Sequence, residues 1–117
     1  MARAFEFSSA VKKQARYRQF GLCACCGESL KDLIEHAHHV IPNQSGNPND
    51  PAHSWLDSVD NCVVICEMCH SRVHQDGKFK TGAVAPADYF QNSHGGKKSL
   101  HQTWVKQLRA HSRRIWG

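Results

Sequence analysis

Four of the six cysteines fall into two C-x2-C pairs, a spacing that is typical of zinc-binding knuckles. Cys23 and Cys26 form the first pair, and Cys66 and Cys69 form the second about forty positions later. Each thiolate pair can span one edge of a tetrahedron around Zn2+. Disulfides explain the pattern less well, because Cys25 stands directly beside Cys26. The spacing therefore predicts one structural zinc bound by four thiolates.

Four histidines have spacings that suit a second metal site. His38 and His39 are adjacent on an expected strand, so their side chains should point to opposite faces. His70 and His74 are four residues apart on an expected helix, so both imidazoles should lie on one face. His38 could complete a set of three nitrogen ligands, which would leave His39 to accept a proton. We interpret the remaining histidines as core or surface residues, namely His36, His53, His94, His101 and His111.

The elements that must position these side chains can be read from hydropathy, capping and turn signals. They are expected in the order helix, strand, long loop, strand, helix and final helix, at 8–20, 36–41, 43–60, 62–65, 67–75 and from Ser99 onward. On the final helix, Leu100, Trp104, Leu108 and Ile115 recur at near-helical spacing and should pack against the core. These elements predict a small α+β fold with a helix at each end.

Length and composition set the class of protein. The chain has 117 residues, of which 40% are hydrophobic, so we expect one small domain that needs a staple such as zinc. The sequence has neither a run long enough for a membrane span nor the apolar core of a signal peptide. Abundant metal-binding thiols favour a reducing compartment, so we expect a cytoplasmic protein without a membrane partner.

Basic residues are concentrated toward both ends of the chain. Residues 1–22 contain five basic residues and one acidic residue, and residues 70–117 contain nine against two, whereas residues 23–69 contain one against seven. Basic ends around an acidic middle suit a polyanion held by its backbone while metal ions occupy the centre. Ordinary solvated charges are the alternative interpretation. The candidate phosphate contacts are Lys12, Lys13, Arg16, Arg18, Lys106, Arg109 and Arg113.

The run H38-H39-V-I-P, followed by Asn61, by C66-E-M-C69-H70 and by His74, resembles the signature of HNH endonucleases. These enzymes belong to the ββα-metal, or His-Me finger, superfamily, and the paired C-x2-C motifs resemble its zinc-stapled branch. The resemblance implies a two-stranded hairpin and a helix around one catalytic metal. It divides the single domain 1–117 into a basic N-terminal helix (1–22), a zinc knuckle with the ββα core (23–77) and a basic tail with a C-terminal helix (78–117).

The resemblance also implies roles for individual residues. His39 matches the general base that activates water, and Asn61 matches an Asn that either pins the loop beside the base or contributes to the metal site. His70 and His74 match the terminal H-x3-H. His38 stands where the family often has Asp, which makes the site resemble colicin-type DNases, in which three histidines hold the metal. Nitrogen ligands favour Zn2+, Ni2+, Co2+ or Mn2+ over Mg2+ as the catalytic ion.

The expected function is metal-dependent endonucleolytic hydrolysis of DNA with little sequence specificity, although the residues do not distinguish DNA from RNA. Such a domain fits a bacterial toxin or effector, a phage enzyme or a restriction enzyme. A toxin would be delivered to the cytoplasm of a target cell and would pair with an acidic immunity protein. Two alternatives belong to other classes: a catalytically inactive, zinc-stapled nucleic-acid-binding module, and a structural or protein-interaction domain. Cleavage and binding assays with added metals separate the three.

Overall fold

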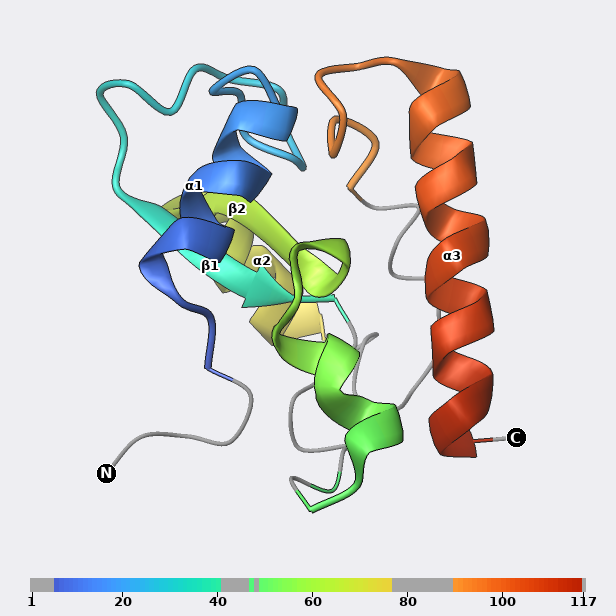
Figure 1. Ribbon diagram of the computed structural model, residues 1–117. Helices are drawn as coiled ribbons and strands as arrows, with labels where there is room; N and C mark the ends of the chain where they lie inside the picture. The colour runs from blue at the N-terminus through green and yellow to red at the C-terminus, as the bar shows by residue number, and fades with distance from the viewer. Residues whose placement is uncertain (1–5, 41–46, 48, 77–89, 117) are drawn as a thin grey trace.

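The computed structural model describes residues 6–40, 47, 49–76 and 90–116, with the side chains of all of these except 72–76, 112 and 114–116. Its elements follow the order expected from the sequence (Figure 1). They are helix α1 (Ser9–Arg18), strand β1 (Glu35–His39), the 3-10 helices η2 (Pro51–Asp57) and η3 (Val59–Asn61), strand β2 (Cys62–Cys66), helix α2 (Glu67–Asp76) and helix α3 (Lys98–Trp116). The fold is therefore α+β, as predicted. The expected strand end at Ile41 lies outside the described residues, whereas α2 ends at Asp76, one residue beyond the expected Gln75.

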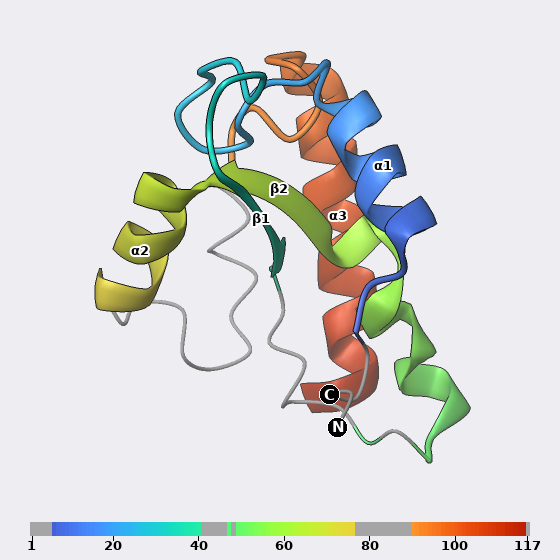
Figure 2. The ribbon, with the colours of Figure 1, turned by 90° about the vertical axis from the view of Figure 1, so that its left-hand side faces the viewer.

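Strands β1 and β2 form an antiparallel hairpin between two helices. Glu35 pairs with Cys66 at one end of the hairpin and His39 pairs with Cys62 at the other. Helix α1 covers one face and α2 covers the opposite face, as the rotated view shows (Figure 2). Every residue of β2 is buried, because this strand of apolar and β-branched residues runs through the centre of the molecule. The candidate histidines of β1 are therefore held by pairing with β2, where His38 lies opposite Val63 and His39 opposite Cys62.

Helix α1 begins and ends at clear local signals. The Ser8 hydroxyl accepts the backbone N–H of Val11 at 3.2 Å and caps the first turn. The helix ends at Arg18, earlier than expected, because Phe20 and Gly21 both adopt left-handed backbone angles, with φ of 57° and 71°. Phe20, at the end of the helix expected over 8–20, lies beyond α1, and its side chain is 61% exposed. A Cβ atom on Gly95 would overlap the Phe20 ring, so the ring needs a glycine there.

Gln19 directly follows α1, and its side-chain amide forms hydrogen bonds with the backbone of β2 at the edge that β1 does not occupy. Its side-chain Oε1 accepts the backbone N–H of Val64, and its Nε2 donates to the Val64 carbonyl, both at 2.8 Å. Gln19 is fully buried, and Nε2 also donates to the carbonyl of Leu22 at 2.8 Å. One amide therefore satisfies the polar groups that an unpaired strand edge would leave without partners.

Gln19→Ala is expected to lower the free energy of unfolding by about 2 kcal/mol, because it leaves the buried Val64 N–H without this acceptor. Denaturant unfolding at a fixed zinc concentration measures the change. The matched control is Gln14→Ala, which truncates an exposed glutamine of the same helix and should shift stability by less than about 0.5 kcal/mol. Equal unfolding midpoints for the two variants would contradict the edge-pairing role.

The segment expected to be a long loop contains two 3-10 helices instead. The Asp50 side chain accepts the N–H of Ala52 at 2.9 Å, and Pro51 starts η2 without needing an N–H partner. Trp55 and Leu56 are buried, which anchors the segment to the core. The Asp50 cap and the two buried side chains explain why a segment expected to be a loop forms 3-10 helices. Residues 41–46 and 48 lie outside the described part of the chain.

Helix α3 packs against η2 and η3 rather than against the hairpin. It begins at Lys98, so Ser99 lies inside the helix and is not its cap. Trp104 and Leu108 are buried as predicted, and Trp104 Nε1 donates to the carbonyl of Asp60 at 2.7 Å. Leu100 was expected on this face but is 47% exposed, because the buried stripe includes His101 instead. The side chain of Ile115 lies outside the described residues.

A buried serine joins the start of α3 to the turn before it. Ser93 Oγ lies 3.0 Å from Nδ1 of His94 and 3.0 Å from Nδ1 of His101. Burial lowers the pKa of His94 to about 4, and the nearby guanidinium of Arg18 acts in the same direction. His94 is therefore neutral near pH 7 and serves packing, in line with the core interpretation.

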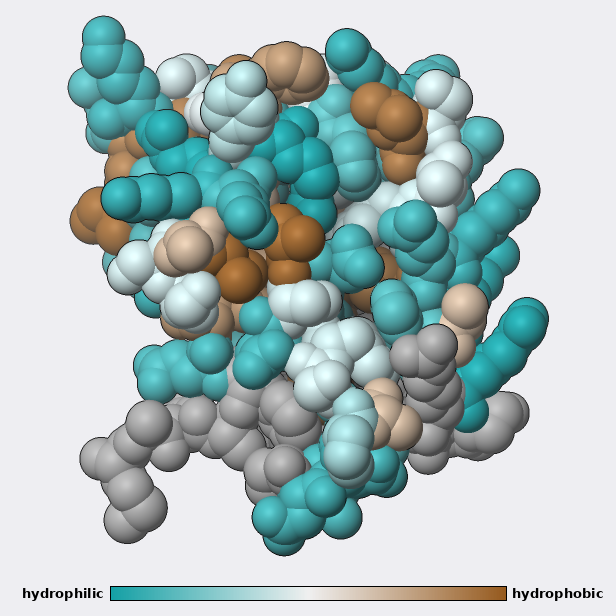
Figure 3. All heavy atoms as spheres, viewed as in Figure 1, coloured by the Kyte–Doolittle hydropathy of each residue, from teal (hydrophilic) through white to brown (hydrophobic). Residues whose placement is uncertain are grey.

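On the face shown in Figure 3, hydrophilic side chains predominate and apolar ones occur in small separate groups. The large apolar residues that are exposed in the described structure come from different elements: Tyr17, Phe20, Leu33, Ile34, Met68 and Leu100. Within the described ranges, none of the helices has the length and apolar character that a bilayer crossing requires.

Candidate active site

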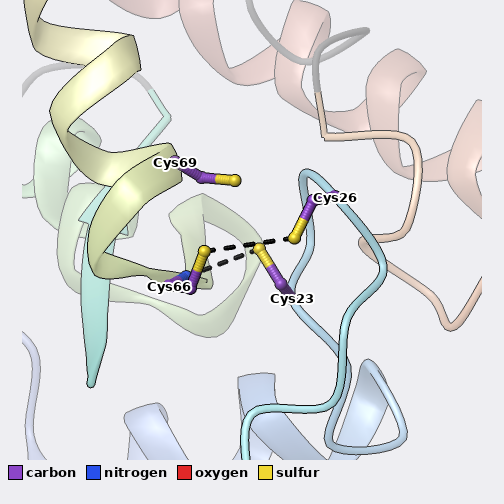
Figure 4. Close-up of side chains that lie close together, drawn as sticks. All are labelled: Cys23, Cys26, Cys66 and Cys69. Atoms are coloured by element: carbon purple, nitrogen blue, oxygen red, sulfur yellow. Dashed lines mark hydrogen bonds between the residues drawn. The ribbon is translucent and has the colours of Figure 1, made fainter. Parts of the chain in front are cut away.

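The four cysteines of the two C-x2-C pairs converge at the junction between β2 and α2 (Figure 4). All four sulfur atoms lie within 4.8 Å of one another, and those of Cys26 and Cys66 are 4.0 Å apart. A Zn–S distance of 2.3 Å in a tetrahedron implies sulfur separations of about 3.8 Å. The cluster therefore fits Zn2+ closely. Among the described residues it is the single set of three or more potential ligands that close together.

Backbone N–H groups prepare one of these sulfurs to ionise. Burial opposes ionisation of Cys23, but N–H groups of Cys26, Cys66 and Cys25 point at its sulfur and lower its pKa. Burial raises the pKa of Cys26 and of Cys69, so these two thiols ionise less readily than Cys23. Such a set of thiols loses its protons when a cation supplies compensating charge.

Cys62 differs from the four clustered cysteines. It lies in the same strand as Cys66 but belongs to the core, and burial raises its pKa to about 12. Cys62 therefore stays a neutral thiol. Its place in the strand is that of a small apolar core residue rather than of a metal ligand.

Strand β1 directs its adjacent histidines to opposite sides, as the strand period requires. His38 lies against α2, with its ring centroid 5.7 Å from that of His70 in an edge-on arrangement. His39 lies on the other side, where its ring stacks on Phe7 at a centroid distance of 3.9 Å. His74 lies one turn beyond His70 on α2, and its side chain is outside the described residues. The structure thus brings together two of the three expected metal ligands and separates them from the expected base.

His36 belongs to the same cluster, although the sequence interpretation assigned it to the core or surface. Its ring stacks on His70 with a centroid distance of 4.6 Å and an angle of 15° between the planes. The spacing of two residues between His36 and His38 already indicated this, because a strand places such residues on the same face. Three imidazoles from β1 and α2 therefore lie together.

A pocket of about 430 Å³ lies between the N-terminal segment and two rings of this cluster, those of His36 and His70. His36, His39 and His70 line it, and so do Phe7 and Lys12 from the other side. Its remaining lining residues are Glu6, Glu35, Ala37 and Val64. Sequence reasoning did not place the residues before α1 in this site. The pocket combines imidazole nitrogens with a lysine ammonium, a combination suited to a metal-bound phosphate.

Comparison with known proteins places this arrangement in a family. Residues 23–76 match the family model described as HNH endonuclease. Residues 23–76 therefore belong to the HNH endonuclease family. The chain is also similar to the type IV methyl-directed restriction enzyme EcoKMcrA of Escherichia coli (strain K12), with 31% identity over 70 residues. That match covers 55% of this chain and 22% of the relative's length. No solved structure matches the chain significantly.

Asn61 of the HNH domain joins the end of β1 to the η2 segment. It is fully buried, and its side-chain Nδ2 donates to the carbonyl of Leu56 at 3.0 Å. Its own carbonyl accepts the N–H of Val40 at 3.1 Å, directly after His39. Of the two roles that the resemblance allows, these contacts support the one in which Asn61 pins the loop beside the base.

The basic residues that flank the HNH domain fall into two groups. Lys12, Lys13, Lys106, Arg109 and Arg113 are exposed and retain the expected role as candidates for phosphate contact. Arg16 forms an ion pair with Glu35 at 3.1 Å. Arg18 departs from the expected role, because its guanidinium donates to the carbonyl oxygens of Cys62 (2.7 Å), Val59 (2.9 Å) and Ser93 (3.1 Å). It also lies 5.7 Å from the Trp104 ring, so it ties α1 to the core instead of facing solvent.

Proposed function

We propose that this chain is a metal-dependent endonuclease that hydrolyses phosphodiester bonds of DNA. The observation that carries the proposal is the division of the β1 histidines: His38 lies beside His70, whereas His39 lies on the opposite side of the strand and lines the pocket together with His70. Metal binding and proton transfer need separate imidazoles. In this arrangement His38 and His70 can bind the metal, and His39 can accept the proton. The similarity to a restriction enzyme supports DNA as the substrate and favours a restriction-type enzyme over a toxin paired with an acidic immunity protein.

His38, His70 and His74 would hold one divalent ion, with the His36 ring supporting His70. This donor set fits Zn2+, Ni2+, Co2+ or Mn2+ better than Mg2+, because it consists of imidazole nitrogens. When bound, the ion supplies positive charge that stabilises the phosphate oxygens in the transition state. Cys23, Cys26, Cys66 and Cys69 would hold a separate structural zinc.

The chain's own residues carry out the remaining steps. His39 accepts a proton from the attacking water. The water oxygen then bonds to the phosphorus as the bond from phosphorus to the 3′ oxygen breaks, and the 3′ oxygen leaves as a hydroxyl after it takes up a proton from solvent. Asn61 holds the chain next to His39 through its contacts with Leu56 and Val40. Lys12 faces the same pocket and binds phosphate, while Lys13, Lys106, Arg109 and Arg113 hold the DNA backbone without reading its sequence.

A plasmid-nicking assay tests the proposal. The zinc-loaded protein is incubated with supercoiled DNA and with Mn2+, Co2+, Ni2+, Zn2+ or Mg2+, before and after mild chelation. Cleavage that requires an added ion, with one zinc retained, is the expected result. Binding without cleavage under every condition would identify a catalytically inactive nucleic-acid-binding module, and neither binding nor cleavage would identify a structural domain.

Lys12→Gln should reduce kcat/KM for DNA cleavage roughly tenfold, the size of one charged contact to a phosphate. The reason is its place in the pocket lining beside His39. Lys13→Gln is the matched control, since it removes the same charge from the next residue of α1, which does not line this pocket. Cleavage kinetics of both variants at several salt concentrations measure the difference. Equal losses at all salt concentrations would reduce Lys12 to a general electrostatic contact.

A further inference from the structure

The two adjacent histidines of β1 lie against different phenylalanines, and both phenylalanines come from outside residues 23–76. Phe7 stacks on His39 with a centroid distance of 3.9 Å and an angle of 16° between the planes. Phe90 lies beside His38 at 5.7 Å with the rings tilted by 44°. Phe7 is 6% exposed and Phe90 is fully buried. The flanks of the HNH domain therefore reach its central strand at two separate points.

The stack of Phe7 on His39 is the closer and more nearly parallel of the two. At 3.9 Å the phenyl ring covers one whole face of the imidazole, so rotation of the His39 side chain would break the contact. Phe7 is itself fixed by the start of α1. The next residue is the helix cap Ser8, whose hydroxyl accepts the N–H of Val11 and whose carbonyl accepts the N–H of Lys12 at 3.1 Å.

Fixing the direction of a base matters for its rate. A misplacement of about 1 Å in an active site can lower a rate by roughly a hundredfold, because proton transfer needs the nitrogen within hydrogen-bond distance of the water. An isolated imidazole on an edge strand has several accessible rotamers. The buried Phe7 ring packs against one face of the His39 imidazole and excludes the rotamers that would turn His39 away from the pocket.

We propose that Phe7 is a positioning residue for His39, so that the active site of this HNH enzyme includes the segment before α1. The inference rests on the proposed function, in which His39 is the base. Phe7 lines the pocket, but its apolar ring offers no ligand to the ion and no hydrogen bond to the phosphate, so it acts through the orientation of His39. It therefore affects the chemical step and leaves the metal ligands unchanged.

The test compares Phe7→Leu with Phe7→Tyr in the zinc-loaded 117-residue chain. Phe7→Leu keeps an apolar side chain but removes the aromatic face, and should lower kcat roughly tenfold to a hundredfold with little change in KM or in affinity for Mn2+. Phe7→Tyr keeps the ring and should retain most of the activity. Phe7→Met should behave as Phe7→Leu does, and it replaces that variant if Leu is not tolerated. Zinc content and tryptophan fluorescence report whether each variant is folded.

The matched control is Phe90→Leu, which removes the ring beside the expected ligand His38. It should weaken Mn2+ binding, and excess Mn2+ should restore its rate, whereas excess Mn2+ should not rescue Phe7→Leu. This contrast separates positioning of the base from general damage to the core.

A spectroscopic measurement keeps the inference independent of activity. The Phe7 ring current should shift the His39 ring protons upfield in NMR spectra recorded without a catalytic ion. Phe7→Leu should remove that shift and leave the His38 resonances in place. A folded Phe7→Leu protein with the parent kcat would overturn the role of Phe7. Full activity of His39→Ala would instead overturn the proposed function, so the two failures are distinguishable.

Discussion

His39→Ala is expected to lower the rate of DNA cleavage by roughly 10²–10⁴ while the protein stays folded and loaded with metal. The variant removes the imidazole that lies on the Phe7 side of β1, away from the His38 and His70 cluster. Metal affinity should therefore change little. Single-turnover cleavage at saturating Mn2+, together with calorimetric measurement of Mn2+ binding, tests both parts of this expectation.

His70→Ala gives the contrasting result. It removes a ring that contacts both His36 and His38, so metal affinity should fall first, and activity should partly return at high metal concentration. His39→Ala should show no such rescue. A folded, metal-loaded His39→Ala enzyme that cuts DNA at nearly the parent rate would refute the division between base and ligands.

The parts of the site that could be predicted from sequence are those set by local periodicity. A two-residue strand period separates His38 from His39, and the C-x2-C spacing brings each thiol pair together. These rules involve only near neighbours in the chain, so they hold whatever surrounds them. The hairpin and the order of its elements followed from the same kind of pattern.

The parts that could not be predicted depend on contacts between distant segments. Gln19 pairs with Val64, 45 positions away, and Arg18 reaches the carbonyl of Cys62, 44 positions away. In the sequence, Arg18 is one of several basic residues near the N-terminus, and nothing local distinguishes it from exposed Lys13. Phe7 likewise has no distinguishing feature in the sequence, where it is an aromatic residue directly before the helix cap Ser8. Only the packing of α1 across the hairpin gives these three residues their roles.

The four-cysteine cluster connects the fold to the candidate catalytic region. Cys66 ends β2 and Cys69 lies in the first turn of α2, so an ion shared with Cys23 and Cys26 fixes where α2 begins. His70 directly follows Cys69 and lies beside His38 on the face of β1 that α2 covers. Loss of the ion would therefore release the helix that carries one of the expected catalytic ligands. Structural zinc is thus expected to be a precondition for the second site as well as for the fold.

Cys66→Ser is expected to leave the domain unfolded or molten, with zinc and cleavage activity both lost. Structural zinc contributes on the order of 10 kcal/mol to small domains, which is comparable to their whole net stability of about 5–15 kcal/mol. Removal of one thiolate also disrupts the sulfur cluster in which Cys66 lies 4.0 Å from Cys26. Zinc analysis, near-UV circular dichroism and thermal unfolding measure the loss.

Cys62→Ser is the matched control, because it makes the same chemical change at the other end of the same strand. Cys62 is buried outside the sulfur cluster, so this variant should keep one zinc and a cooperative transition, with a cost of about 1–3 kcal/mol for the buried hydroxyl. Mild chelation of the parent protein should act differently again, by abolishing cleavage while the zinc at the four cysteines remains. A folded, active preparation that contains no zinc would refute the stapling role, since the four thiols would then be holding the two segments together without an ion.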